Sequence, residues 1–210
     1  MNKLGDLSCN EFLTELASAA PAPGGGGGAA MAGALAAALA SMVANLTIGK
    51  EKFADREPEV KELLEQAEAE RVRLLTLVDE DAAVFNSFMS CYKLPKATDE
   101  EKAARTAAIR AAAKQAATVP LNIARSSFAV LKLADRLVVS GNPSVITDGA
   151  CSGLLARAAL RCAEYNVRIN LGLTKDEVWN AQAAADLKQL LADAEALEAR
   201  LLAVTDKALQ

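Results

Sequence analysis

The chain has 210 residues and a mass of 21.9 kDa, and 46 of its residues are alanine. Alanine is the strongest helix former and a poor strand residue, so the composition predicts an all-α fold, a multihelical bundle in one domain over residues 1–210. The net charge of −4 argues against a nucleic-acid-binding surface, and the absence of histidine excludes Ser-His-Asp and Cys-His catalysis and imidazole metal ligands.

The first quarter of the chain combines a short helix, a glycine run and a long apolar segment. Ser8 and Glu11 form a capping box that starts the helix, and Pro21 ends it. Five glycines at positions 24–28 lead into the uncharged, alanine-rich segment 29–48, which is long enough to span a bilayer. Because alanine favours insertion only weakly, the central helix of a bundle is the preferred interpretation, and we expect no membrane span.

Long helices are also predicted for the middle of the chain. Pro58 fits the first turn of a helix whose apolar pattern runs unbroken to about Cys91. A helix of about nine turns in a chain of this size predicts a protruding helical hairpin, suited to serve as a dimerisation arm. Thr98 and Glu101 form a second capping box, and the helix that follows is expected to break or kink at Pro120.

Two further helices are predicted for the remainder of the chain. One runs from about residue 147 to 171 and is expected to stop at Gly172. Thr174 with Glu177 predicts a third capping box, which opens a last helix that reaches the C-terminus. No segment alternates apolar and polar residues clearly enough to indicate a strand.

The four cysteines form neither a metal motif nor a redox motif, because they contain no C-x-x-C pair. Cys151 and Cys162 would share a helix face, but they would lie about 16 Å apart, too far for a disulfide. The N-terminal residues have no apolar signal-peptide core. These features predict a reduced cytoplasmic protein without a metal site.

The glycine run is the first candidate for a binding site. Gly24, Gly26 and Ala29 match a relaxed dinucleotide-binding pattern, but that pattern requires a preceding strand, and prolines stand there instead. A glycine loop that opens onto a helix N-terminus presents free N–H groups to an anion or a carbonyl oxygen. We interpret the run as a ligand-binding loop, and the alternative is a flexible connector.

Asp81 is the most informative carboxylate. On a helical projection it lies about 60° from the centre of the apolar stripe, whereas Asp79 lies about 100° away, on the flank. A partly desolvated carboxyl has a raised pKa and can exchange a proton near neutral pH. The alternative for Asp81 is an ion pair or the cap of another helix.

Further polar residues lie near the end of the apolar segment and beyond it. Asn45 stands inside an apolar run and needs a partner if it is buried, while Lys50 follows the same segment, where a lysine commonly complements a helix dipole. Asp148 fits either a helix N-terminus or a second position in a site. Asn166 and Asn170 lie one turn apart.

Taken in order, these segments resemble the cyclodeaminase/cyclohydrolase family. That family contains the C-terminal cyclodeaminase domain of formiminotransferase-cyclodeaminase and small bacterial methenyltetrahydrofolate cyclohydrolases. The specific segments are Pro-Ala-Pro-Gly-Gly-Gly at 21–26 and the stretch 34–50 with its Asn-Leu-Thr-Ile-Gly-Lys ending. Supporting segments lie at 77–85, 94–96, 119–121 and 166–170.

The resemblance implies a multihelical homodimer with a folate substrate, active without a metal or nucleotide cofactor. It places the acidic catalytic residue in the Asp-Glu-Asp segment, which we assign to Asp81 first and to Asp79 second. This chain departs from the family pattern at Gly27, where serine is usual, and at Phe53, where tyrosine is usual. We expect the substrate to be bound by Gly24, Gly25, Gly26, Gly27, Asn45, Thr47, Lys50 and Asp148.

The expected activity is hydrolysis of 5,10-methenyltetrahydrofolate to 10-formyltetrahydrofolate. One alternative is a formimidoyltetrahydrofolate cyclodeaminase that releases ammonia. The other is a folate-binding helical dimer that has lost catalysis, for which the missing serine hydroxyl at Gly27 is the best sequence support.

Overall fold

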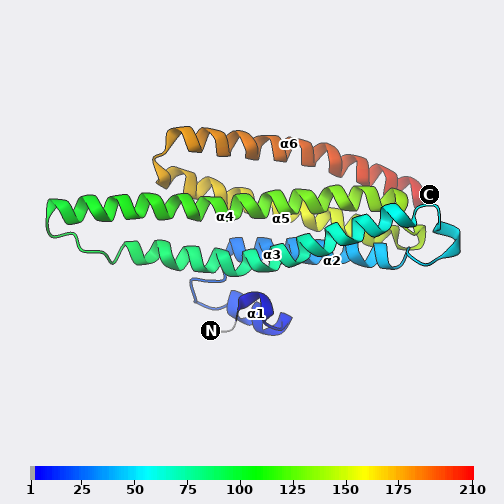
Figure 1. Ribbon diagram of the computed structural model, residues 1–210, viewed down its shortest axis with the longest axis horizontal. Helices are drawn as coiled ribbons and strands as arrows, with labels where there is room; N and C mark the ends of the chain where they lie inside the picture. The colour runs from blue at the N-terminus through cyan, green and yellow to red at the C-terminus, as the bar shows by residue number, and fades with distance from the viewer. Residues whose placement is uncertain (1–2) are drawn as a thin grey trace.

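The computed structural model describes residues 3–210, which fold as a bundle of long helices (Figure 1). No strand is present in this part of the chain, which confirms the predicted all-α class. Three short 3-10 helices are η1 (Leu4–Asp6), η2 (Glu51–Phe53) and η3 (Pro143–Val145). The α-helices are α1 (Cys9–Leu16), α2 (Gly25–Asn45), α3 (Glu57–Cys91), α4 (Asp99–Ser140), α5 (Ile146–Thr174) and α6 (Glu177–Ala208).

Helix α4 is the centre of the bundle, because it packs against α2, α3, α5 and α6. Helix α2 packs against both α3 and α5, and α6 packs against α4 and α5. The end of α3 and the beginning of α4 form a hairpin that extends past the ends of α5 and α6 (Figure 1). The predicted helical hairpin is therefore confirmed, while its role in dimerisation stays a prediction.

The apolar segment near the N-terminus forms α2, a helix within the core. It is long and apolar enough to cross a membrane, but 61% of its most apolar stretch is buried inside the bundle. At Gly33, a Cβ atom would lie 3.0 Å from Cδ2 of Leu74 and 3.1 Å from Oγ of Ser127. Small residues thus let α2 approach α3 and α4 closely, as expected for the central helix of a bundle.

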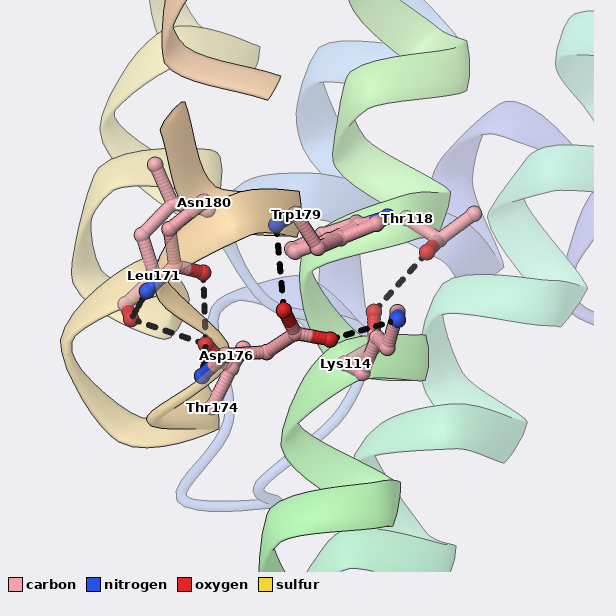
Figure 2. A network of polar contacts seen from close by, with 7 residues as sticks. All are labelled: Lys114, Thr118, Leu171, Thr174, Asp176, Trp179 and Asn180. Carbon is pink, nitrogen blue, oxygen red and sulfur yellow. Dashed lines mark hydrogen bonds and ion pairs between the residues drawn. The ribbon is translucent and has the colours of Figure 1, made fainter. Parts of the chain in front are cut away.

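Two of the three predicted capping boxes are present, at Ser8 and at Thr98. The third prediction is wrong, because α5 continues past Gly172 and Thr174 is its last residue. Asp176 instead caps α6, and its carboxylate accepts a hydrogen bond from the backbone N–H of Trp179 (3.0 Å; Figure 2). Asp and Thr are both good N-cap residues, so the choice depends on where α5 ends.

A polar network fastens the α5–α6 turn to α4 (Figure 2). Nζ of Lys114 lies 2.8 Å from Oδ2 of Asp176 and 5.3 Å from the ring centroid of Trp179. The Thr174 hydroxyl donates to Oδ1 of Asn180 (2.5 Å). Because these contacts join the end of α5 and the start of α6 to α4, they fix the position of the last turns of α5.

Of the two outcomes expected at Pro120, a break does not occur, because α4 continues as one element of 42 residues. A proline inside a helix leaves the carbonyl four residues earlier without its N–H donor, and here that carbonyl belongs to Ala116. The side-chain amide of Asn170 on α5 donates to this oxygen at 2.9 Å. The contact between α4 and α5 therefore replaces the missing helical hydrogen bond.

Candidate active site

A cavity of about 330 Å³ lies where the start of α2 meets α3, α4 and the last turns of α5. Its walls are largely apolar, with Phe85 and Phe88 from α3, Val119 from α4 and Leu173 from α5. Asp81 is the only titratable side chain among the described residues that line it. Its polar lining is completed by Gly24, Gly25, Gly26, Asn166 and Asn170.

The glycine run is the beginning of α2, which corrects the expectation of a loop. Gly24 is the N-cap, and Gly25 is the first helical residue. The first intrahelical bond runs from the N–H of Gly28 to the oxygen of Gly24 (2.9 Å), and no side chain caps the helix. The N–H groups of Gly25, Gly26 and Gly27 therefore have no helical acceptor. Gly25 and Gly26 line the cavity, whereas Gly27 does not line it and donates to the Asp81 carboxylate.

The Asp81 carboxylate packs directly against the backbone of Gly26. A Cβ atom at Gly26 would lie 2.3 Å from Oδ1 of Asp81 and 2.6 Å from its Cγ. No side chain fits at that distance, so glycine is required at position 26 as long as the carboxylate keeps this place. At Gly28, by contrast, a Cβ atom would meet only Cδ2 of Leu16, at 3.9 Å.

Burial raises the pKa of Asp81 above its ordinary value, because the surrounding apolar walls disfavour the charged form. The backbone N–H of Gly27 acts in the opposite direction and is the smaller effect. The positive end of the α2 dipole also faces the carboxylate. Asp81 is half-buried, and its inward position agrees with the helical projection. A carboxyl whose pKa is raised is a stronger base than an exposed aspartate and can accept and return a proton.

Asp79 lies on the flank of α3, as the projection predicts, and it does not line the cavity. Its Oδ1 accepts hydrogen bonds from the backbone N–H groups of Leu4 (2.6 Å) and Gly5 (3.4 Å). This carboxylate therefore fastens η1 to α3. The structure does not place Asp79 beside Asp81 in the cavity. The geometry therefore does not support Asp79, the second choice from the sequence, as a catalytic residue.

Four of the expected substrate-binding residues lie at the opposite end of α2. The 21-residue helix separates Asn45 from the glycine run by about 30 Å. Thr47 is buried and accepts from the N–H of Asn142 (2.8 Å), which ties the end of α2 to the α4–α5 connection. Lys50 is exposed ahead of η2, and Asp148 occupies the first turn of α5. Within one chain, none of these four lines the cavity.

Residues that the sequence did not identify as part of the site complete the cavity. Phe85 and Phe88 fit the core pattern of α3, so no sequence signal separates them from ordinary core residues. Asn166 and Asn170 are detectable as a pair one turn apart, but only the packing of α5 against α2 and α4 brings them to the glycine run. The Asn166 amide nitrogen lies 3.5 Å from where a Gly25 Cβ would be.

The cysteines are all free, and three of them are exposed. None lines the cavity. Within residues 3–210, no group of three or more Cys, Asp or Glu side chains is placed to hold a metal ion.

Comparisons with known proteins agree on one family. The family model described as formiminotransferase-cyclodeaminase matches residues 8–189. The chain is 44% identical to a methenyltetrahydrofolate cyclohydrolase of Methylorubrum extorquens, covering 94% of this chain and 95% of that protein. It is also 34% identical to the formimidoyltransferase-cyclodeaminase of Rattus norvegicus, of which it spans only 36%.

The fold has a close structural counterpart. A crystal structure of formiminotetrahydrofolate cyclodeaminase from Thermotoga maritima superposes with a TM-score of 0.88 at 30% sequence identity, covering 98% of both chains. This chain therefore has the fold of that cyclodeaminase over nearly the whole length of both chains. The chain belongs to the formiminotransferase-cyclodeaminase family.

Proposed function

We propose that this protein is a folate one-carbon enzyme that hydrolyses 5,10-methenyltetrahydrofolate to 10-formyltetrahydrofolate. The observation that carries the proposal is a single carboxylate, Asp81, in a cavity whose other lining residues are uncharged. The substrate is a cation at the methenyl carbon, and a lone half-buried carboxylate is its electrostatic complement. The similarity to the M. extorquens cyclohydrolase, over nearly the full length of both chains, supports the same reaction.

The cavity has the size and walls for the ring portion of a folate. A volume of about 330 Å³ lies at the lower end for small-molecule sites, so it can take the ring system while the glutamate tail extends outward. Phe85 and Phe88 supply flat apolar surface for that ring. The free N–H groups at the start of α2 supply donors for its carbonyl oxygen.

In the proposed mechanism, Asp81 moves one proton from water to N5 of the folate. Its carboxylate accepts a proton as water adds to the methenyl carbon, and a neutral carbinolamine forms. The same carboxyl then protonates N5, the bond between that carbon and N5 breaks, and the hydroxyl loses its proton as the formyl carbonyl forms on N10. The net reaction consumes one water and releases one proton, and the substrate's positive charge is lost.

We further propose that the reaction needs no metal or nucleotide cofactor, because the substrate itself carries the electrophilic cationic carbon. We also propose a cytoplasmic location, because free and exposed thiols persist in a reducing compartment.

The cyclodeaminase reaction is the second candidate function. There the 5-formimino group closes onto N10 and ammonia leaves, so a proton must reach the departing nitrogen. Asp81 can supply that proton from the same position. The T. maritima cyclodeaminase structure, similar over the full chain, favours this alternative.

We also propose that two copies of the chain associate through an apolar face shared by α2 and α5. Helix α2 carries no charged residue, yet Leu35 and Met42 on it are 52% and 42% exposed. The neighbouring α5, joined to α2 by the Ser152 hydroxyl donating to the oxygen of Ala36 (2.7 Å), exposes Leu154. An uncharged helix that exposes large apolar side chains is typical of a permanent interface, and the second copy is the expected occupant.

Replacing Asp81 with asparagine tests the proposed function. Asp81→Asn keeps the shape of the side chain but cannot carry the proton, so we expect turnover to fall by about 10²- to 10⁴-fold. The variant should melt no lower than the wild type at pH 7, because it removes a desolvated charge. The measurement is the loss of methenyltetrahydrofolate absorbance, with circular dichroism melting and the exposed neighbour variant Glu80→Gln as controls.

Unchanged turnover in Asp81→Asn would remove Asp81 from the mechanism. If the wild type instead releases ammonia from the formimino substrate alone, the cyclodeaminase is the correct activity. Folate binding without either turnover would identify a binder that has lost catalysis.

The pH dependence of the rate should report the raised pKa of Asp81. The free enzyme needs the ionised carboxylate, so kcat/KM should rise with pH through the pKa of Asp81, which burial places above the ordinary value for aspartate. In the complex the cationic substrate favours the ionised form, so the same limb in kcat should lie at lower pH. Steady-state rates at several pH values, corrected for the uncatalysed reaction, check both limbs. If kcat and kcat/KM rose over the same pH range, or if the rise persisted in Asp81→Asn, the assignment of this pH dependence to Asp81 would be contradicted.

The close approach at Gly26 predicts a strong effect from a single methyl group. Gly26→Ala should abolish most turnover, because the new Cβ would displace the Asp81 carboxylate. Gly28→Ala lies in the same turn and has only ordinary contact there, so we expect wild-type activity and an equal or higher melting temperature. Measuring turnover and melting of both variants separates displacement of the carboxylate from any general effect of alanine in this turn.

The proposed dimer can be tested by placing a charge on the α2–α5 face. Leu35→Glu should yield a folded monomer in sedimentation experiments, because the interface would bury an unpaired carboxylate. The control is Val178→Glu on α6, where the side chain is 84% exposed outside this face, and it should stay dimeric. A Leu35→Glu protein that remains a dimer would point to the hairpin of α3 and α4 as the interface.

A further inference from the structure

The side-chain amide of Asn170 is held by both of its hydrogens. Its Nδ2 donates to the carbonyl oxygen of Ala116 on α4 (2.9 Å) and to that of Asn166 one turn earlier on α5 (2.8 Å). An asparagine amide has two N–H donors, so both are used. Because two carbonyl oxygens surround the nitrogen, the orientation of the amide is settled, and its Oδ1 is left as an acceptor.

Pro120 leaves the carbonyl oxygen of Ala116 without its donor within the helix. Proline is the least favourable residue inside a helix, because it lacks the N–H that would bond the carbonyl four residues earlier. Pro120 is buried, and α4 continues through it, so the Ala116 carbonyl needs a donor from outside the helix. Asn170 is that donor, and the proline thereby fixes the side chain of a residue on a neighbouring helix.

Asn170 and Ala116 both line the cavity that contains Asp81. Among residues 3–210, no donor bonds to Oδ1 of Asn170, while the start of α2 contributes free N–H groups to the same cavity. The polar lining thus offers donors on the α2 side and a fixed acceptor on the α5 side. A pterin ring carries a carbonyl oxygen and, beside it, the N–H donors of N3 and the 2-amino group, and it matches this arrangement.

We propose that Asn170 is a substrate-binding residue whose Oδ1 accepts a hydrogen bond from an N–H group of the pterin ring, and that Pro120 is its positioning residue. The proposal rests on the proposed folate function. It adds which part of the substrate is recognised, the pterin ring, and which residues recognise it. Asn170 takes no part in proton transfer, which belongs to Asp81. Its loss should therefore weaken binding and leave the chemical step nearly intact.

A double-variant cycle in the full-length protein tests this proposal. The dissociation constant for tetrahydrofolate, which lacks the reacting carbon, is measured by calorimetry beside kcat and KM for the methenyl substrate. Asn170→Ala should raise the dissociation constant and KM about tenfold, as expected for one lost hydrogen bond, with kcat within about threefold. Pro120→Ala should raise the dissociation constant several-fold, because the new N–H at position 120 competes for the Ala116 carbonyl and frees the Asn170 amide.

The double variant is the decisive comparison. With Asn170 already replaced by alanine, Pro120→Ala should change the dissociation constant by less than about twofold, because it has no side chain left to release. The double variant also restores a donor to Ala116, so it should fold even if Asn170→Ala does not. A merely structural role of Pro120 would weaken binding equally in both backgrounds, and that result would overturn the proposal.

The outcomes also separate this proposal from the function on which it rests. A wild-type protein that neither binds tetrahydrofolate nor turns over a folate would overturn both. An active wild type with unchanged affinity in Asn170→Ala, or in the double variant, would overturn only the role of Asn170.

Discussion

The close packing of the Asp81 carboxylate against the Gly26 backbone is the constraint on which the site depends. It requires glycine at position 26, in the first turn of α2, although glycine is among the poorest helix formers. It also places a carboxyl where apolar walls raise its pKa and the helix N-terminus opposes that rise. The glycine at position 26 is therefore explained by the carboxylate that packs against it, whereas helix propensity alone would favour another residue there.

The bundle compensates for this weak start of α2 through packing. Ala30, Ala36, Ala37 and Ala40 are fully buried, and Gly33 allows contact with α3 and α4 that a larger residue would crowd. Close approach of this kind gains dispersion contacts along the whole helix. The same small residues leave α2 thin enough for α3 and α5 to flank it, which brings Asp81 and the end of α5 to one cavity.

Local signals in the sequence were sufficient for most of the fold, for Asp81 and for the three glycines at positions 24–26 that line the cavity. Helical periodicity placed Asp81 inward, and capping patterns located the starts of α1 and α4. Sequence proximity misled where distance along a helix matters, since Asn45 belongs to the same apolar segment as the glycines yet ends about 30 Å away. Asn170 is visible in the sequence as one of two asparagines one turn apart, but its role depends on the register between α4 and α5, which sets which carbonyl it faces.

A single titratable group restricts the proposed chemistry to a shuttle. Because residues 3–210 bring no second acid or base to the cavity, the proton that Asp81 takes from water must be the one it gives to N5. The carboxylate is ionised beside the cationic substrate and neutral beside the neutral carbinolamine, so the site carries no unpaired charge in either state. Burial penalises the ionised form of Asp81 and so favours its protonation by water. Asp81 can still be ionised when the substrate binds, because the cationic substrate is its counter-ion.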